Sequence, residues 1–194
     1  MERVHRIKSA EIGRDTGLND YPDLVLALEY WGRLCDGRRL PPREALDPAD
    51  IKPLLPRVML VDVLPGKPPR FRYRLSGTAI CNVHGGDLKD LFPEDMQPPE
   101  YGRLVGRHYL ECYERVEPLT HVIVLQTTEK QWSYARIILP FGDAEDDMSH
   151  LLVVDSEHGN TLAECLDRIE ARCAAKPQGL SEDRPFRVVH HPSV

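Results

Sequence analysis

The order in which strand-like and helical segments follow one another constrains this chain more than any other feature of its sequence. Five segments have the apolar or alternating pattern of β-strands, and a polar, helical stretch at 78–115 separates the first two from the last three. The strand-like segments are 57–64, 70–76, 119–127, 131–141 and 150–155. This order allows one antiparallel sheet to be covered on one face by the helices of the middle stretch. We therefore expect an α+β fold shaped like a small cup, which indicates a binding function.

Two further segments have the apolar stripe of an amphipathic helix, and they flank the cup on either side. The first runs from 22 to 36 and the second from 161 to 175. The stripe residues are Leu24, Leu28, Trp31 and Leu34 in the first helix and Leu162, Leu166 and Ile169 in the second. We predict four regions: a flexible N-terminus at 1–20, a domain at 21–158 that includes the first helix, a C-terminal helix at 159–175 and an irregular tail at 176–194.

Composition narrows the class of protein and its partners. The 194 residues carry a net charge of −6 without a basic stripe, which disfavours nucleic-acid binding because that binding relies on clustered Lys and Arg. The five cysteines are widely spaced and form no Cys-x-x-Cys pair, a pattern that fits a reducing compartment. The N-terminus has no apolar secretion signal, and no run approaches the roughly 18 apolar residues of a membrane span. The sequence therefore predicts a cytoplasmic protein that binds neither nucleic acid nor membrane.

One set of residues is spread over the first helix, the proline-rich connector and the second strand. It consists of Tyr30-Trp31, Leu40-Pro41, Arg43, Asp47-Pro48, Asp50-Ile51, Leu55-Pro56, Phe71 to Leu75 and Gly77-Thr78. In these residues the region 22–155 resembles the PAS_5 family of PAS-like proteins of alphaproteobacteria, and the segment IILPFGD is similar to that family's closing hairpin. The resemblance implies a PAS fold, in which a five-stranded antiparallel sheet flanked by helices binds small molecules or partner proteins.

In a PAS fold, the pocket lies between the inner face of the sheet and the middle helices. The residues that we predict to line it come from the strands and from the helices at 78–84 and 100–115. They are Tyr73, Leu75, Ile80, Val105, His108, Tyr109, Cys112, Val124, Tyr134 and Ile138. A register error of one residue would move any of the strand positions to the opposite face.

His108 and Cys112 are four residues apart on the middle helix and therefore share one of its faces. A neutral imidazole at this place is able to ligate a haem iron or to hydrogen-bond a ligand. The alternative is a buried histidine beside a small apolar residue. Beyond a haem held by His108, the sequence points to no cofactor.

Three polar patterns have a functional and a structural interpretation. Arg72 and Arg74, with Asp62 on the neighbouring strand, either receive an anionic ligand or form cross-strand ion pairs. The acidic turn at 143–147 either binds calcium or is a solvated hairpin turn. The Gly-Gly-Asp at 85–87 lacks the residues of a cyclase motif and is typical of a helix stop.

No nucleophile elbow, phosphate loop or zinc-protease motif occurs in the sequence, so we predict a protein without enzymatic activity. We expect a sensor or regulatory module that binds a small molecule or a signalling partner. One alternative is a ligand-free adaptor whose pocket is filled by its own side chains. Another is a small enzyme that uses His108 or His84 as a base. The two flanking helices either both pack over the outer face of the sheet, or one of them exposes its apolar stripe to a second subunit. We predict a homodimer through the helix at 22–36, since exposed apolar stripes usually mark interfaces.

Overall fold

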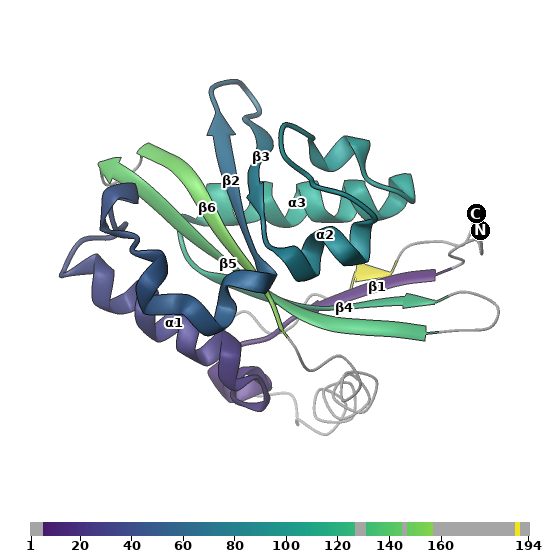
Figure 1. Ribbon diagram of the computed structural model, residues 1–194, viewed down its shortest axis with the longest axis horizontal. Coiled ribbons are helices and arrows are strands. Elements are labelled where there is room, and N and C mark those ends of the chain that lie inside the picture. Colours follow the sequence, from purple (N-terminus) through teal and green to yellow (C-terminus); the bar gives the residue numbers. More distant parts are fainter. Residues whose placement is uncertain (1–5, 127–130, 145–146, 157–188, 191–194) are drawn as a thin grey trace, which may run out of the picture.

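The computed structural model describes residues 6–126, 131–144, 147–156 and 189–190 (Figure 1). The predicted C-terminal helix at 159–175, with Leu162, Leu166 and Ile169, lies outside the described residues, as does most of the predicted tail.

The strands form one antiparallel sheet in the order β3-β2-β6-β5-β4-β1-β7. Their bounds are β1 Arg6–Glu11, β2 Val58–Leu64, β3 Arg70–Ser76, β4 Leu119–Gln126, β5 Gln131–Ala144, β6 Asp147–Asp155 and β7 Val189–His190. The five predicted strands are the five from β2 to β6, and they occupy consecutive places in the sheet. The α+β class with an antiparallel sheet is therefore confirmed, but the predicted number of five strands was too low.

Strand β1 forms where the sequence predicted a flexible N-terminus. It pairs with β4 from Arg6 opposite Gln126 to Glu11 opposite His121. Its alternation places Ile7 in the apolar cluster on one face of the sheet and Ala10 in the cluster on the other. Lys8 and Ser9 lie between these two apolar residues, so the sequence does not show the regular alternation of a strand. Two short 3₁₀ helices, η1 at Arg14–Thr16 and η2 at Leu18–Asp20, connect β1 to the first α-helix.

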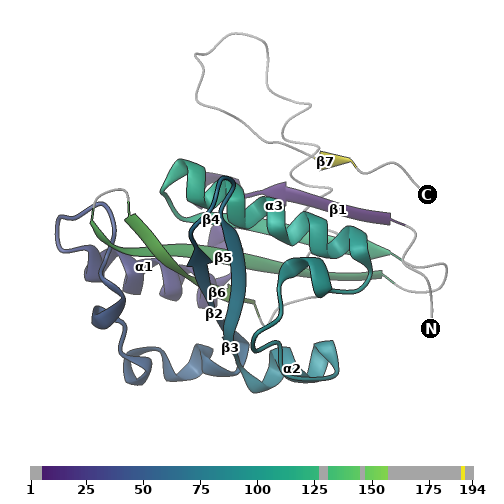
Figure 2. The same ribbon diagram turned by 90° about the horizontal axis from the view of Figure 1, so that it is seen from above.

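Helices cover both faces of the sheet. Helix α1 (Pro22–Cys35) lies on one side, and α2 (Thr78–His84) and α3 (Pro99–Arg115) lie on the other (Figure 1). The 3₁₀ helices η3 (Arg43–Ala45) and η4 (Pro48–Arg57) follow α1, and η5 (Pro93–Asp95) precedes α3. In the view of Figure 2, α3 covers the sheet on the side where β1 and β4 lie. We call the face under α2 and α3 the inner face and the face under α1 the outer face.

Helix α1 uses its apolar stripe within its own chain. Leu24, Ala27 and Tyr30 are at most 1% exposed in the outer cluster, and the Trp31 Nε1 donates a hydrogen bond to the Pro140 carbonyl of β5 at 2.7 Å. The partly buried Leu28, Trp31 and Leu34 pack against the same cluster. Because Leu24 has no exposed surface, the structure does not offer this stripe to a partner, and the interface predicted on it is wrong at Leu24. The homodimer itself stays a prediction.

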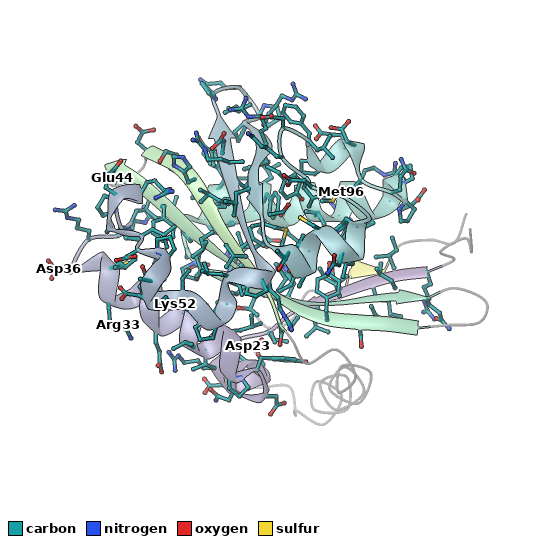
Figure 3. All side chains as sticks on the ribbon, in the orientation of Figure 1. Asp23, Arg33, Asp36, Glu44, Lys52 and Met96 are labelled. Carbon is teal, nitrogen blue, oxygen red and sulfur yellow. The ribbon has the colours of Figure 1, made fainter. Side chains whose placement is uncertain are left out.

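The charged residues of this layer face outward. Figure 3 labels Arg33, Asp36 and Lys52 on the α1 side of the molecule, away from the sheet, and all three are exposed. Within the described part of the chain, no helix has the length and apolar content that crossing a membrane requires.

Candidate functional site

Most of the predicted pocket residues meet on the inner face, where they form one core. Six of them belong to the inner cluster: Tyr73, Ile80, Val105, Tyr109, Cys112 and Ile138. His108 is also buried, at 4% exposure, and the half-buried Tyr134 packs against the clusters of both faces. The predicted convergence of these strands and helices is present in the structure.

Leu75 and Val124 were assigned to the wrong face. The β2–β3 register moves from Leu60 opposite Leu75 to Val61 opposite Tyr73, so Arg74 is an extra residue in β3. This β-bulge reverses the alternation, and Leu75 is 51% exposed instead of lining a pocket. Val124 belongs to the outer cluster, because its neighbour Ile123 takes the inner position on β4.

Replacing Leu75 with serine tests the bulge. We expect the free energy of unfolding to change by less than about 0.5 kcal/mol, because an exposed side chain away from the core contributes little. Urea unfolding followed by circular dichroism measures this value. A loss above roughly 2 kcal/mol, typical of truncating a buried leucine, would place Leu75 in the core.

The inner face is filled by the side chains of the protein itself. The hydroxyl groups of Tyr73 and Tyr109 are 3.2 Å apart, and the Tyr73 hydroxyl also contacts Met96 Sδ at 3.5 Å. Met96 is labelled on the α2–α3 side in Figure 3. The Phe71 ring meets the Tyr109 ring edge-on, with centroids 5.6 Å apart. Burial raises the pKa of Tyr109 to about 12 and also raises that of the Cys112 thiol.

A buried ion pair lies among these residues. The Arg136 guanidinium on β5 is 0% exposed and donates two hydrogen bonds to the Asp155 carboxylate on β6, at 2.6 and 2.9 Å. Arg136 Nη2 also donates to the Tyr101 hydroxyl at 3.3 Å, and that hydroxyl is 2.6 Å from the hydroxyl of Tyr134. We call Arg136, Asp155, Tyr101 and Tyr134 the Arg136 cluster. Arg136 Nη1 has no hydrogen-bond partner within the described residues.

Sequence reasoning missed the Arg136 cluster. Its signal was a single arginine at an inward position of the apolar strand SYARIILPF, with an aspartate at the end of the next strand. His84, at the end of α2, lies beside the cluster with its ring centroid 6.2 Å from that of Tyr101. Burial lowers the pKa of His84, and the positive charge of Arg136 lowers it further. His84 is therefore neutral at pH 7 and is poorly suited to hold a proton there.

His108 is part of a stacked histidine pair and does not face a cavity. Its ring lies against that of His121 with centroids 3.7 Å apart and planes 9° apart. His108 Nε2 is 3.2 Å from the Ser9 hydroxyl of β1. A haem iron could reach this nitrogen only if Ser9 moved away. The structure thus favours the buried, structural interpretation of His108.

The arginines of β3 form the cross-strand ion pairs that were the structural alternative to an anion site. Arg72 and Arg74 donate to the two carboxylate oxygens of Asp62, at 2.9 and 2.6 Å. Burial alone would raise the pKa of Asp62, but the hydrogen bonds from Arg74 and Arg72 outweigh it and keep this pKa below its usual value. The acidic turn at 143–147 lies partly outside the described residues. In the rest of the chain that the structure describes, no group of three His, Cys, Asp or Glu side chains is arranged to hold a metal ion.

A pocket of about 500 Å³ opens at the surface, beside the inner cluster, whose Phe71 lines it. Its walls come from the turn between β2 and β3, from η5 and from the side of α3 that carries Gly102 and Gly106. We call it the α3 pocket. Sequence reasoning missed it as well, although glycines four residues apart in a helix beside proline-rich turns offered a signal.

Gly102 and Gly106 differ in the space around their Cβ positions, so we expect substitution by alanine to have opposite effects on the stability of the protein. A Cβ at Gly102 would lie 2.1 Å from the Pro93 carbonyl oxygen, whereas one at Gly106 would lie 3.6 Å from Pro93 Cβ. We expect Gly102→Ala to destabilise the protein by about 1–3 kcal/mol through overpacking. Gly106→Ala is expected to stabilise it by up to about 1 kcal/mol through helix propensity. Thermal unfolding of both variants measures the difference, and equal effects would contradict the close packing of η5 on α3.

Comparison with known proteins adds one match. Residues 21–152 match the family model PAS_5, described as a PAS domain. The matched range begins just before α1 and ends within β6, so it includes α2, α3 and five of the strands, whereas β1 lies outside it. No curated protein matches the chain.

Proposed function

Because this chain belongs to the PAS_5 family of PAS domains, we propose that it is a regulatory module that acts by binding another protein. PAS domains are generally signalling modules without catalytic activity, and this supports a sensor or regulatory role for the chain. On this proposal the inner face is a structural core, and the signal passes through the surface of the domain. Of the three roles that the sequence left open, the filled inner face supports the adaptor.

The observation that carries this proposal is the filling of the inner face. Tyr73, Val105, Tyr109 and Ile138 are all 0% exposed and belong to one cluster. A site for a small molecule usually needs a cavity of about 300–1,000 Å³ with a few polar groups. The α3 pocket has this size, but it opens at the surface beside the inner cluster and is not enclosed within it.

A second function, the sensing of a small polar molecule, is favoured by the Arg136 cluster. An unsatisfied buried donor costs about 1–3 kcal/mol, so the Nη1 group of Arg136 favours any bound acceptor. A water molecule or a carbonyl group of a ligand satisfies it equally well. The tyrosine hydroxyls of the cluster would add two further polar contacts for such a ligand.

An enzymatic function has less support. His108 stacks on His121 with its Nε2 beside the Ser9 hydroxyl, and burial together with the charge of Arg136 lowers the pKa of His84, so His84 would hold an abstracted proton only weakly. The Cys112 thiol, one turn from His108 on α3, has a raised pKa and is a poor nucleophile. We therefore infer that the protein has no catalytic centre on its inner face.

Native mass spectrometry of the purified full chain tests the proposal. We expect the mass of the chain, 22.1 kDa, or a whole multiple of it, without a bound organic molecule. An adduct that persists under native conditions and is lost on denaturation would contradict the self-filled core. If Tyr101→Phe also abolished that adduct, the second function would replace the first, with the Arg136 cluster as the binding site.

A further inference from the structure

We propose that the α3 pocket is a docking site for a short segment of a partner protein in which apolar and acidic side chains alternate. This inference rests on the proposed function, since it gives the adaptor a place to bind its partner. Three properties of the pocket support it: an apolar lining, an excess of arginine and a helix position, Gly106, without a side chain.

The lining of the pocket is mainly apolar and rigid. It is formed by Pro68, Pro69, Phe71, Pro93 and Leu110. Phe71 is 6% exposed, so its ring is held between the inner cluster and the pocket. Proline has a fixed φ and loses little conformational freedom when a ligand binds. Such a surface is suited to receive the apolar side chains of an extended segment.

Arginines exceed acidic residues around this apolar lining. The lining contains three arginines, Arg70, Arg103 and Arg107, and two glutamates, Glu94 and Glu100. The formal charge of the pocket is therefore +1, on a chain whose net charge is −6. The occupant that complements this charge is acidic, because guanidinium groups bind carboxylates with two parallel hydrogen bonds.

Two of the arginines are able to accept a carboxylate at small cost. The Arg70 guanidinium lies 4.1 Å from the Phe92 ring centroid, and a guanidinium stacked on a ring keeps its in-plane N–H groups for other partners. Arg103 pairs with Glu100 at 3.2 Å, but their side chains are 65% and 43% exposed. An ion pair this exposed stabilises little, so exchange of Glu100 for a carboxylate of the partner is nearly neutral.

Gly106 leaves the backbone of α3 partly uncovered at the pocket. Gly102 is buried in the contact with η5, whereas the Cβ position of Gly106 makes only ordinary van der Waals contact. A side chain at Gly106 would project into the pocket without breaking the helix. This position therefore provides a variant that blocks the site while it favours the fold.

Titration of the full chain, followed by ¹H–¹⁵N NMR, tests the proposal. The probe is a pool of synthetic pentapeptides in which Leu or Phe alternates with Asp or Glu, and the control pool has Lys at the acidic positions. We expect the acidic pool to shift the amide signals of Gly102, Gly106 and Arg107. Gly106→Leu and Arg70→Glu are expected to weaken binding at least about tenfold.

Matched variants on the opposite side of the sheet control for the two substitutions. Gly32 lies in α1 with open space at its Cβ position, and Lys52 is exposed on η4. Gly32→Leu and Lys52→Glu are expected to bind the acidic pool with unchanged affinity. The proposal is overturned if the acidic pool causes no shifts, if the lysine pool binds equally well, or if the pocket variants bind as well as these controls. An organic adduct in native mass spectrometry would refute the self-filled core but not change this titration, so the two failures are distinguishable.

Discussion

Replacement of Asp155 with alanine is expected to lower the free energy of unfolding by about 3–5 kcal/mol. The substitution leaves the Arg136 guanidinium, which is 0% exposed, without the carboxylate that accepts two of its hydrogen bonds. Among the described residues this guanidinium then keeps its contacts with the neutral Tyr101 hydroxyl and the Tyr134 ring, which do not offset the buried charge. Urea unfolding at pH 7, followed by circular dichroism, measures the loss.

Removal of both charges provides the control. The double variant Arg136→Met with Asp155→Leu is expected to be more stable than Asp155→Ala alone, because apolar side chains of similar size replace a buried pair at little cost. If Asp155→Ala lost less than about 1 kcal/mol, the pair would be behaving as an exposed salt bridge. That result would contradict the burial of the Arg136 cluster.

Acid is expected to destabilise the protein through His121. Burial lowers the pKa of this imidazole to about 3, and the positive charges of Arg115 and Arg136 contribute to the shift. The folded protein therefore keeps His121 neutral, while the unfolded chain takes up a proton below pH of about 6.5. The stability is fully present above that pH and is lost as the pH falls toward 3, on the order of 4 kcal/mol in all. Urea unfolding at a series of pH values measures this dependence.

The variant His121→Phe separates this contribution from that of the carboxylates. Phenylalanine preserves the ring stacked on His108 and removes an Nδ1 that has no partner within the described residues. We expect the variant to lose less stability than the wild type between pH 6.5 and 4, by about one proton's slope of 1.4 kcal/mol per pH unit. Identical slopes for the two proteins would show that His121 is accessible to protons in the folded state.

The sequence pattern predicted the architecture well wherever periodicity was strong. The apolar run of VMLVDVL identified β2, and the alternation in RFRYRLS identified β3. The apolar stripe of the middle helix identified α3. The resemblance to the PAS_5 family, which the family match over 21–152 confirms, then arranged these elements as one sheet with helices.

The β-bulge, strand β1 and the Arg136 cluster depend on contacts between distant segments, which the periodicity of one segment does not predict. The β-bulge at Arg74 is a property of the pairing of β2 with β3, so the strand pattern alone placed Leu75 on the inner face. Strand β1 gains its stability from Ile7 and Ala10 only when β4 is beside it. The ion pair between Arg136 and Asp155 connects the neighbouring strands β5 and β6, and the spacing of the two residues in the sequence does not predict it.

The apolar stripe of α1 shows how a correctly predicted element left its role open. From the sequence, the stripe belonged either on the outer face of the sheet or against a second subunit. In the structure the outer face has its own apolar cluster, to which β4, β5 and β6 contribute, and helix α1 covers this cluster and buries Leu24 in it. The homodimer stays a prediction, and our proposal places a partner at the α3 pocket.

A high-resolution crystal structure of the purified full chain tests the central claim most directly, because it shows what occupies the inner face. We expect electron density for the protein's own side chains between α3 and the sheet, with at most a water molecule beside Arg136 Nη1. Density for an organic molecule at the Arg136 cluster, with Tyr101 or Tyr134 displaced to receive it, would contradict the self-filled core and establish the inner face as a ligand site.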